Sequence, residues 1–583
     1  MEFEFKLDDF QVEATQHINN GKSVVLCAPT GAGKTVLAEH AIHLAIKTNK
    51  KVFYTTPLKA LSNQKFNDFS VKYGQEKVGL LTGDTSINRG AQVTIMTTEV
   101  FRNMLYGTHF GKVEENMKDV QYVVLDEVHY MNDEQRGTVW EESIIHCPNN
   151  IQLIALSATI ANSQALTDWI NSVHGKTELV FTDFRPVPLR HYFYSPTSPH
   201  ELPPLFAPGG KLNARIQAES KTKKSKEKSK PRFSVPQLIT VLNKKNMLPA
   251  IYFAFSRKKC DTFMEMCAGL QLLSDFEKQR IVQIIDEYII DNPYLTKNKH
   301  LEYLYFGVAA HHAGLLPAWK GLIEKLFQQG LIKVVFATET LAAGINMPAR
   351  TTIISSISKR SDDGHRNLNA NEFLQMSGRA GRRGMDEVGH VITVASPYES
   401  PEEIALLASS KSNPLESRFA PGYSMVLNLL QRFSLEESRE LILKSFGYYS
   451  STERLKPLHQ QKKEFEDIIY NIKNYKCPYG LSTEDLLNYN KYKNMYIEHR
   501  NITKTLKKQA RNAGRHDAVE VREFDEKTRE YFNQMHESAC NDCKKYRTHI
   551  KDIEVVSRFE SKLSKLERTI EYQKDVYWRQ FLN

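Results

Sequence analysis

Two apolar patterns divide the chain. Over the first two thirds, short and nearly continuous apolar runs end in glycine, proline or small polar residues, which predicts buried strands of parallel sheets. Such runs lie at residues 23–27, 51–56, 122–125, 153–156, 250–253 and 334–337. In the last third, segments 420–430 and 441–446 have helical spacing, and the charged chain beyond them has long helical periodicity. The pattern predicts an α/β protein with a mostly helical C-terminal region.

A glycine-rich turn follows the first of these runs and precedes the helical pattern of residues 36–42. The turn consists of Ala28, Pro29, Thr30, Gly31, Ala32, Gly33, Lys34 and Thr35. Strand, glycine turn and helix in this order predict a loop whose backbone N–H groups bind phosphate. Lys34 would reach the terminal phosphates of a nucleoside triphosphate and Thr35 would ligate magnesium, and by itself the motif indicates only NTP binding. The strict phosphate-loop pattern has glycine at the position of Ala28. The alternative to a phosphate-binding loop is a glycine-rich turn that binds no nucleotide.

Upstream of this loop, Gln11 follows an aromatic residue, and its amide can both donate and accept, which suits an adenine. A capped helix start would look the same. Downstream, the apolar run 122–125 ends in Asp126 and Glu127. We assign Asp126 to magnesium and Glu127 to the attacking water, with an acidic surface turn as the alternative. Ser157 and Thr159 follow the next run. Taken alone they form only a small-hydroxyl turn, but in this order of motifs they are the expected link between nucleotide state and domain closure.

Other apolar runs end in hydroxyl, amide or basic residues. A helix that begins with such residues can bind the backbone phosphates of a nucleic acid without reading its bases. The candidates are Pro57, Lys59, Thr82, Gly83, Thr97, Thr98, Arg257, His312 and Thr338. The paired histidines 311 and 312 also suggest a metal, but no other ligand with suitable spacing lies near them.

A second glycine-rich run, residues 377–384, carries arginines three positions apart on one helical face. Arg379 and Arg382 are predicted to neutralise charge on the transferring phosphate, with Gln375 near the terminal phosphate. Read alone, the arginines would be plausible nucleic-acid contacts. The phosphate loop upstream favours the first interpretation.

The order of these motifs resembles superfamily 2 DExH-box helicases. The resemblance implies two RecA-like domains with ATP between them and nucleic acid across their top. It rests on matching positions at Lys34, Thr35, Asp126, Glu127, His129, Ser157 and Thr159. The segment with Thr338 and Gly344 resembles the part of a helicase that couples RNA contact to hydrolysis. The helical segments after the arginines resemble the winged-helix region of superkiller-type (Ski-like) RNA helicases, which implies 3′ to 5′ movement.

The expected domains are RecA-like at 1–190, a basic flexible linker at 191–235, RecA-like at 236–395, winged-helix-like at 396–455 and a charged helical stalk at 456–583. The linker carries a lysine run and was expected to bury no core. It could instead provide nonspecific phosphate contacts. An Asp-Gly turn within residues 356–366 predicts a hairpin that either splits a duplex or is an ordinary surface hairpin. The family's β-barrel insertion and final helical bundle were expected to be missing, which puts processive unwinding in doubt.

Composition adds limits to this picture. The 583 residues suggest about three or four domains. A net charge of +10 is a mild sign of a polyanionic partner, although a solvated surface explains it almost as well. No apolar run approaches the roughly 20 residues that span a bilayer, and the acidic N-terminus is unlike a signal or transit peptide. We therefore expect no membrane partner and a location in the cytoplasm or the compartment that synthesises the chain.

The cysteines give two further expectations. Seven cysteines, an odd number on a long chain, favour reduced thiols. Cys477, His536, Cys540 and Cys543 could together bind zinc, or could belong to ordinary helix packing.

The leading hypothesis is an ATP-dependent RNA helicase that uses ATP and Mg²⁺ on single-stranded or 3′-tailed RNA, with RNA-decay or ribonucleoprotein partners. A DNA helicase of the same superfamily is one alternative. A nonprocessive RNA-binding ATPase clamp or scaffold is the other. RNA-specific or DNA-specific stimulation of ATP hydrolysis would separate the first two, and strand displacement would test the third.

Overall fold

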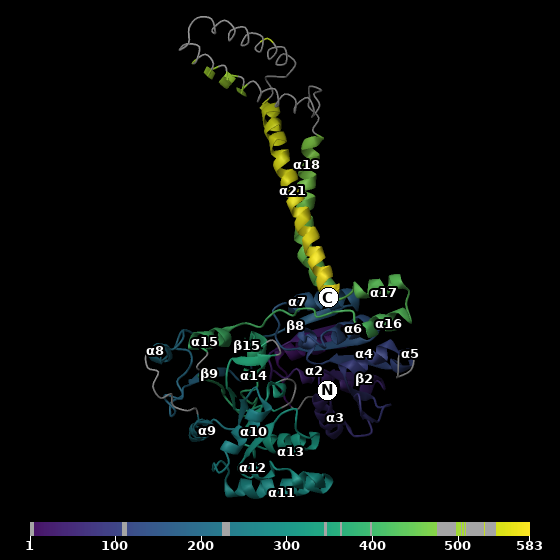
Figure 1. The fold of residues 1–583 in the computed structure, drawn as a ribbon. Coiled ribbons are helices and arrows are strands. Elements are labelled where there is room, and N and C mark those ends of the chain that lie inside the picture. The colour runs from purple at the N-terminus through teal and green to yellow at the C-terminus, as the bar shows by residue number, and fades with distance from the viewer. Residues whose placement is uncertain are drawn as a thin grey trace. The chain divides into compact units, whose positions relative to one another are not determined.

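The computed structural model describes residues 5–107, 113–223, 234–342, 347–361, 364–396, 399–474 and 544–582, with isolated residues between 497 and 530. The chain forms two compact units, Met1–Gly447 and Tyr448–Asn583. Within the first unit, two parallel sheets are each covered by helices (Figure 1). The predicted fold class, two parallel-sheet α/β domains with a helical C-terminal region, is confirmed.

The first domain is built on a sheet with the order β4-β3-β5-β2-β6-β7-β1-β8. All neighbours are parallel except β4, which runs antiparallel to β3. Strands such as β1 are buried along their whole length, because helices cover both faces of a parallel sheet. The strands are β1 (Ser23–Cys27), β2 (Lys51–Thr56), β3 (Val78–Leu81), β4 (Ser86–Ile87), β5 (Val93–Thr97), β6 (Val120–Leu125), β7 (Gln152–Ser157) and β8 (Thr177–Phe181).

Helices connect these strands. The phosphate-loop helix α2 contributes Leu37, Ala41 and Ala45 to a core shared with β1, β2 and β6. The helices are α1 (Asp9–Asn19), α2 (Thr35–Lys47), α3 (Lys59–Tyr73), α4 (Thr98–Tyr106), α5 (Val113–Asn116), the 3-10 helix η1 (Val128–Asn132), α6 (Thr138–His146) and α7 (Ser163–Val173).

The second domain has a parallel sheet with the order β11-β12-β10-β13-β16-β9. Ile251 and Phe253 of β10 pack into one core, whereas Ala250 and Tyr252 pack into another, so both faces of the sheet are covered. The strands are β9 (Leu189–Tyr194), β10 (Ala250–Phe253), β11 (Val308–His311), β12 (Val334–Ala337), β13 (Thr351–Ile354) and β16 (Gly389–Val394).

Outside this sheet, β14 (Ser358–Ser361) and β15 (Gly364–Asn367) pair antiparallel, which confirms the predicted hairpin. The helices of the domain are α8 (Ala214–Lys223), α9 (Val235–Lys244), α10 (Arg257–Met266), α11 (Asp275–Asp291), η2 (Pro293–Lys297), α12 (Leu301–Leu304), α13 (Pro317–Gln328), η3 (Glu339–Leu341) and α14 (Ala370–Ser377).

The linker prediction is wrong for residues 191–223. β9 pairs with β16 at the edge of the second sheet. Leu205 and Ile216 are buried in the core of the second domain, beside Phe193. The prediction gave too much weight to the lysine run, much of which lies at positions 224–233, outside the described residues, and too little to the apolar residues before it.

Residues 399–447 return to the first domain. Their helices are α15 (Pro401–Ser409), α16 (Tyr423–Leu430) and α17 (Leu435–Ile442). Arg432 donates to the carbonyl of Leu105 (2.9 Å), and Trp169 Nε1 donates to the carbonyl of Lys444 (2.7 Å). This part of the described chain holds helices and no strand, so the winged-helix assignment stays a prediction.

The second unit is a pair of long helices, α18 (Phe446–Lys473), whose first residues belong to the first unit, and α21 (Lys544–Leu582), which lie side by side (Figure 1). Lys473 pairs with Glu560 (2.6 Å) and Lys462 with Glu567 (2.8 Å), while the rings of Phe465 and Phe559 lie 5.6 Å apart. The helical C-terminal region is confirmed, and its role as a stalk stays a prediction. None of the described helices is long and apolar enough to cross a membrane.

Candidate nucleotide site and nucleic-acid edge

The carboxyl ends of neighbouring strands bring the first domain's candidate residues to one edge of the sheet. The strand order β5-β2-β6-β7-β1 places Thr97, Pro57, Asp126, Ser157 and Ala28 in series along that edge. In open parallel sheets, ligands bind at this edge. One sheet therefore carries the phosphate loop at one side and the predicted nucleic-acid loops at the other.

The phosphate loop has the backbone of an anion-binding turn. Gly31 and Gly33 have φ angles of 84° and 91°, which residues with a side chain rarely adopt. Lys34 Nζ donates to the carbonyls of Ala28 (3.0 Å) and Pro29 (3.2 Å). Burial lowers the pKa of Lys34, while the carboxylates of Glu127 and Asp126 act in the opposite direction. A buried amine held by loop carbonyls is suited to a polyphosphate.

Asp126 and Glu127 lie beside this loop, at the end of β6. The Tyr54 hydroxyl donates to Asp126 Oδ2 (2.6 Å), and the Glu127 N–H donates to Asp126 Oδ1 (3.0 Å). Burial and the neighbouring Glu127 raise the pKa of Asp126 to about 6. Burial also raises the pKa of Glu127, but the charges of His129, Lys34 and Arg379 outweigh it and hold that pKa below its usual value. Glu127 therefore loses its proton more readily than Asp126 does.

His129 connects the first domain to the second. Its Nδ1 lies 3.4 Å from Glu127 Oε2 and accepts a hydrogen bond from the Ala158 N–H (3.3 Å). On the other side of the ring, His129 Nε2 and Gln375 Nε2 are 2.7 Å apart. Ala158 lies between the two predicted coupling residues, buried Ser157 and half-buried Thr159. The predicted Gln375 thus meets the acidic motif directly across the two domains.

The glycine-rich run of the second domain positions its arginines differently from one another. Arg379 is buried and donates to the carbonyl of Ala342 through Nε (3.0 Å) and a terminal nitrogen (2.6 Å). Burial lowers the pKa of Arg379, and nearby Glu127 opposes this shift. Arg379 therefore lies within electrostatic reach of the acidic pair, as expected for a group that neutralises phosphate charge.

Arg382 pairs with a carboxylate in this structure, and its predicted role on the transferring phosphate stays a prediction. Its guanidinium forms a two-point pair with Asp386 (2.8 and 2.9 Å), and Arg350 contacts the same carboxylate (2.8 Å). The neighbouring Arg383 instead reaches the first domain, where it donates to the carbonyl of Ala32 (3.2 Å) and pairs with Asp8 (2.9 Å). A role for Arg382 on phosphate would require it to leave Asp386.

Gln11 lies against the phosphate loop. Its Nε2 donates to the carbonyl of Gly33 (3.0 Å), and its Oε1 accepts from the N–H of Asp8 (2.9 Å) at the start of α1. The side chain is fully buried. Both the capped helix start and contact with the nucleotide loop are therefore realised at this residue, while its adenine contact stays a prediction.

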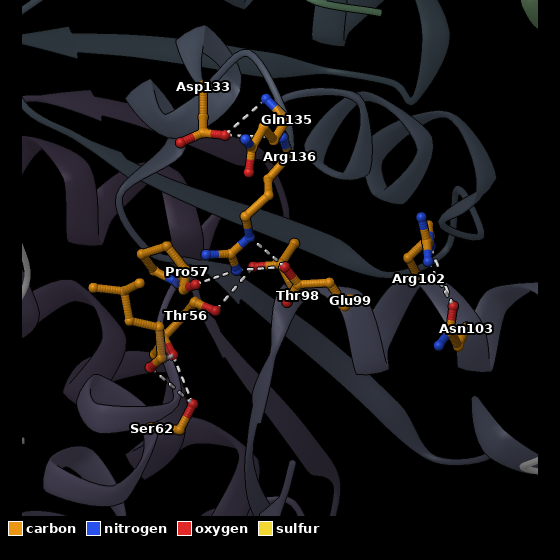
Figure 2. Close-up of polar contacts among 11 residues, drawn as sticks. Thr56, Pro57, Ser62, Thr98, Glu99, Arg102, Asn103, Asp133, Gln135 and Arg136 are labelled. Atoms are coloured by element: carbon orange, nitrogen blue, oxygen red, sulfur yellow. Dashed lines mark hydrogen bonds and ion pairs between the residues drawn. The ribbon is translucent and has the colours of Figure 1, made fainter. Parts of the chain in front are cut away.

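The nucleic-acid candidates of the first domain fall into two groups. Lys59 and Gly83 are exposed, and Lys59 pairs with Asp84. Thr98 is buried, and its hydroxyl donates to the carbonyl of Thr56 (3.1 Å), as Figure 2 shows. Thr98 therefore connects the start of α4 to the end of β2, and its contact with nucleic acid stays a prediction.

The remaining first-domain candidates are Pro57, Thr82 and Thr97, which are buried. The hydroxyl of Thr82 donates to Asp84 (3.0 Å). In the second domain, Arg257, His312 and Thr338 follow the adjacent strands β10, β11 and β12. Arg257 is exposed, Thr338 is half-buried, and His312 is buried with its Nε2 3.1 Å from Asp261.

Two comparisons with known proteins agree with this geometry. The family model of DEAD/DEAH box helicases matches residues 8–167, and that of the helicase conserved C-terminal domain matches residues 234–384. "DExH-box ATP-dependent RNA helicase DExH15 chloroplastic" from Arabidopsis thaliana is 42% identical over 531 residues, which cover 80% of this chain and 45% of that protein.

Two further relatives identify the branch. "Exosome RNA helicase MTR4" from Homo sapiens is 37% identical over 523 residues, 84% of this chain and 49% of that protein. "Antiviral helicase SKI2" from Saccharomyces cerevisiae is 37% identical over 548 residues, 81% of this chain and 42% of that protein. The chain belongs to the superkiller-type DExH-box helicases of superfamily 2. It spans about half the length of these relatives.

DExH helicases use ATP with Mg²⁺, and the residues present fit both. Mg²⁺ prefers oxygen ligands, and Thr35 and Asp126 supply them beside Lys34. The Asp126 carboxylate is held in one orientation and lies next to a second acid, so a cation there would be favoured. No cluster of three His, Cys, Asp or Glu within the described residues could hold a metal by itself. Gly344 and the zinc candidates Cys477, His536, Cys540 and Cys543 lie outside the described residues.

Sequence reasoning missed several residues of this helicase site. Arg185 donates to the carbonyls of Thr30 and Gly378 (both 2.9 Å) and so joins the phosphate loop to the second domain. Lys65 Nζ donates to Thr35 Oγ1 (3.3 Å). Tyr54 orients Asp126 from the neighbouring strand β2. Each of these three residues is distant in sequence from the motif it contacts, so the local sequence pattern contains no signal for its role. Arg383 was also missed, and the only sign of it in the sequence was its position directly after Arg382.

Proposed function

We propose that the chain is the ATPase motor of a 3′ to 5′ RNA helicase that acts in RNA processing or decay. The observation that carries this proposal is the meeting of two domains at one phosphate loop. Lys34, Asp126, Glu127 and His129 come from the first domain, and Gln375 lies 2.7 Å from His129. A site assembled from two domains can respond to ATP by changing how they are held together.

Each residue has a distinct proposed role in hydrolysis. Glu127 orients the attacking water and accepts its proton, while Lys34 and Arg379 neutralise charge on the phosphates. Mg²⁺, when bound with ATP, shields the same phosphate oxygens. Gln375 and His129 report the state of this site across the domain boundary. Ser157, the last residue of β7, and Thr159, two residues later, are proposed to couple that state to domain closure.

RNA is proposed as the nucleic acid because two of the reported relatives are named RNA helicases. Contacts to the phosphate backbone suit the positively charged chain and predict salt-dependent, largely sequence-independent binding. Single-stranded or 3′-tailed RNA is the proposed substrate, with RNA-decay or ribonucleoprotein partners. Zinc binding at the cysteines and a location in the compartment where the chain is made remain proposals. The proposed domain boundaries move to about residue 188 between the two sheets, because β9 belongs to the second.

The first prediction concerns ATP turnover. We expect steady-state ATP hydrolysis to be stimulated by single-stranded RNA more than by single-stranded DNA, and the stimulation to weaken as salt rises from about 50 to 200 mM. Glu127→Gln should still bind ATP while turnover falls by at least about a hundredfold, because the water loses its orienting carboxylate. ATP binding is measured with a fluorescent analogue and turnover by phosphate release.

Other outcomes have defined meanings. Equal stimulation by DNA would favour the DNA-helicase alternative. Strong RNA stimulation without displacement of a 3′-tailed duplex would favour a nonprocessive clamp. Near-normal hydrolysis by Glu127→Gln would contradict the role given to that residue, and absence of stimulation by either nucleic acid would contradict the motor proposal for this chain.

A further inference from the structure

We propose that Arg136 is a positioning residue for RNA binding. It would hold two segments of the first domain, the loop at Pro57 and the start of α4 at Glu99, in the arrangement that receives the RNA backbone. This inference rests on the proposed function and adds a residue that no motif of the nucleotide site contains. Arg136 lies in the segment between η1 and α6, downstream of Asp126 and Glu127.

The backbone of this segment directs the Arg136 side chain toward the Pro57 loop and the start of α4. Asp133 Oδ1 accepts hydrogen bonds from the backbone N–H groups of Gln135 (3.0 Å) and Arg136 (2.9 Å). This closes a turn in which an aspartate side chain holds its own backbone. In Figure 2 the Arg136 side chain extends from this turn toward Pro57 and Glu99. Its direction is therefore fixed from behind as well as by its partners.

The guanidinium of Arg136 bridges the Pro57 loop and the start of α4. Nε donates to Glu99 Oε1 (2.7 Å), and a terminal nitrogen contacts both Glu99 and the carbonyl of Pro57. The Pro57 loop follows β2, and Glu99 lies in the first turn of α4, which follows β5. The planar fork of arginine can satisfy a carboxylate and a carbonyl together, which the single ammonium of lysine does less well.

Neighbouring contacts reinforce the same connection. The Thr98 hydroxyl donates to the carbonyl of Thr56 (3.1 Å), and the Thr56 hydroxyl lies 2.7 Å from that of Ser62 in α3. The carbonyls of Thr56 and Pro57, adjacent in sequence, are thus both tied to the start of α4 (Figure 2). The starts of α3 and α4 become a single unit at the carboxyl edge of the sheet.

This unit has the features of a phosphate-backbone contact. Helix starts present free N–H groups to anions, and the exposed Lys59 lies at the start of α3. Glu99 is a carboxylate at the same edge, where it would repel phosphate if it were unpaired. Arg136 offsets this charge and also fixes the separation of the two helix starts, on which contact with successive phosphates depends.

The test uses substitutions whose charge effects and positional effects differ. Arg136→Lys keeps the charge and loses the fork, so any weakening of RNA binding reports position. Glu99→Ala removes a negative charge and also the partner of Arg136. A pure charge effect predicts tighter RNA binding by Glu99→Ala, whereas the positioning role predicts weaker binding.

Arg102→Lys is the matched control. Arg102 lies on α4, the helix that carries Glu99, and its guanidinium pairs with the carboxylate of Glu142 (3.4 Å). The exposed fraction of its side chain is 26%, similar to the 32% of Arg136. It also contacts Asn103 rather than the Pro57 loop. Arg102→Lys therefore removes the same guanidinium group from a position that does not connect the Pro57 loop to the start of α4.

We expect Arg136→Lys and Glu99→Ala each to raise the dissociation constant for single-stranded RNA, measured by fluorescence anisotropy, by about tenfold. The RNA concentration that half-saturates ATP turnover should rise equally, while kcat at saturating RNA changes by less than about twofold. Arg102→Lys should match the wild type. Thermal unfolding of each variant separates these effects from loss of the fold.

Two results would overturn the inference. The first is wild-type RNA affinity in Arg136→Lys, or tighter binding in Glu99→Ala. The second is an equal loss of kcat and RNA affinity in Arg136→Lys with a matching fall in Tm, which would make the contact merely structural. RNA binding is measured without ATP, so this test does not depend on the proposed motor function. Failure of the motor function would be seen separately, as ATP hydrolysis by the wild-type protein that RNA does not stimulate.

Discussion

At the residue scale, the acidic pair shows how two adjacent carboxylates acquire different properties. Glu127 adopts a left-handed backbone conformation with φ of 55°, which is uncommon for a residue with a long side chain. This conformation turns Glu127 away from the direction of β6 and toward His129, while Asp126 stays against β2. Cationic neighbours keep Glu127 ionised, and the Tyr54 hydroxyl orients Asp126.

The orienting role of Tyr54 gives a prediction. Tyr54→Phe removes the hydroxyl that donates to Asp126, so the carboxylate loses its fixed direction toward the magnesium position. We expect the Mg²⁺ concentration for half-maximal ATP binding to rise by about tenfold, measured with a fluorescent ATP analogue. Tyr252→Phe is the matched control, because Tyr252 lies in β10 of the second domain, is equally buried, and its hydroxyl has no hydrogen-bond partner among the described residues. Equal Mg²⁺ requirements in both variants would contradict the role.

At the scale of elements, helix α6 anchors the chain after it leaves the second domain. Glu141 of α6 is fully buried. It accepts hydrogen bonds from the Ser417 hydroxyl (2.6 Å) and from the backbone N–H of Phe446 (2.7 Å), where α18 begins. Phe446 also packs on Trp169 of α7, with ring centroids 5.3 Å apart. One carboxyl group therefore connects the returning segment, through Ser417 and Phe446, to α6 of the first domain.

This anchor predicts a pH dependence. Burial raises the pKa of Glu141 from 4.5 to about 7, so the folded state binds its proton more tightly than the unfolded state. The resulting stability is fully present below pH 4.5 and is lost as pH rises through about 7, a change of about 3 kcal/mol. Glu141→Gln cannot titrate, so its stability relative to wild type should rise between pH 5 and 8. Thermal unfolding of both proteins across this range is the measurement, and parallel pH profiles would contradict it.

At the scale of the first unit as a whole, its two sheets are joined through backbone atoms at the phosphate loop. Arg185, in the connection between β8 and β9, donates to the carbonyls of Thr30 and Gly378. A Cβ on Gly378 would approach the side chain of Thr30 to 3.0 Å, so the two domains lie very close here. Burial lowers the pKa of Arg185 to about 10, which leaves it charged at neutral pH.

Removal of Arg185 should therefore affect both stability and turnover. Arg185→Met keeps the length of the side chain but leaves several carbonyls without a donor, which should cost about 3 kcal/mol. We expect a lower Tm and about a tenfold lower kcat/KM for ATP, because the loop and the glycine-rich run are no longer held together. Arg280→Met is the control: Arg280 is exposed on α11 and contacts Gln283 of the same helix. Unchanged kcat/KM in Arg185→Met would contradict this role.

Much of the fold could be predicted from sequence because its signals are local. The apolar run before Ala28, the glycines at 31 and 33 and the helical pattern after Thr35 are adjacent in the chain, so one reading finds strand, loop and helix. The same holds for Asp126 and Glu127 after β6. The prediction of a linker at 191–235 was wrong because β9 completes a sheet whose other strands lie far along the chain. A single edge strand has little sequence pattern of its own.

The sequence by itself determined the two parallel-sheet domains, the phosphate loop, the acidic pair and the hairpin at 358–367, since each depends on residues close together in the chain. Only the tertiary structure decided which side chains complete them. It paired Arg382 with Asp386, sent Arg383 to Ala32 and Asp8, and joined Arg136 to Glu99. Such partners are chosen by the packing of distant segments, because an arginine binds whichever carboxylate or carbonyl the folded chain brings within reach.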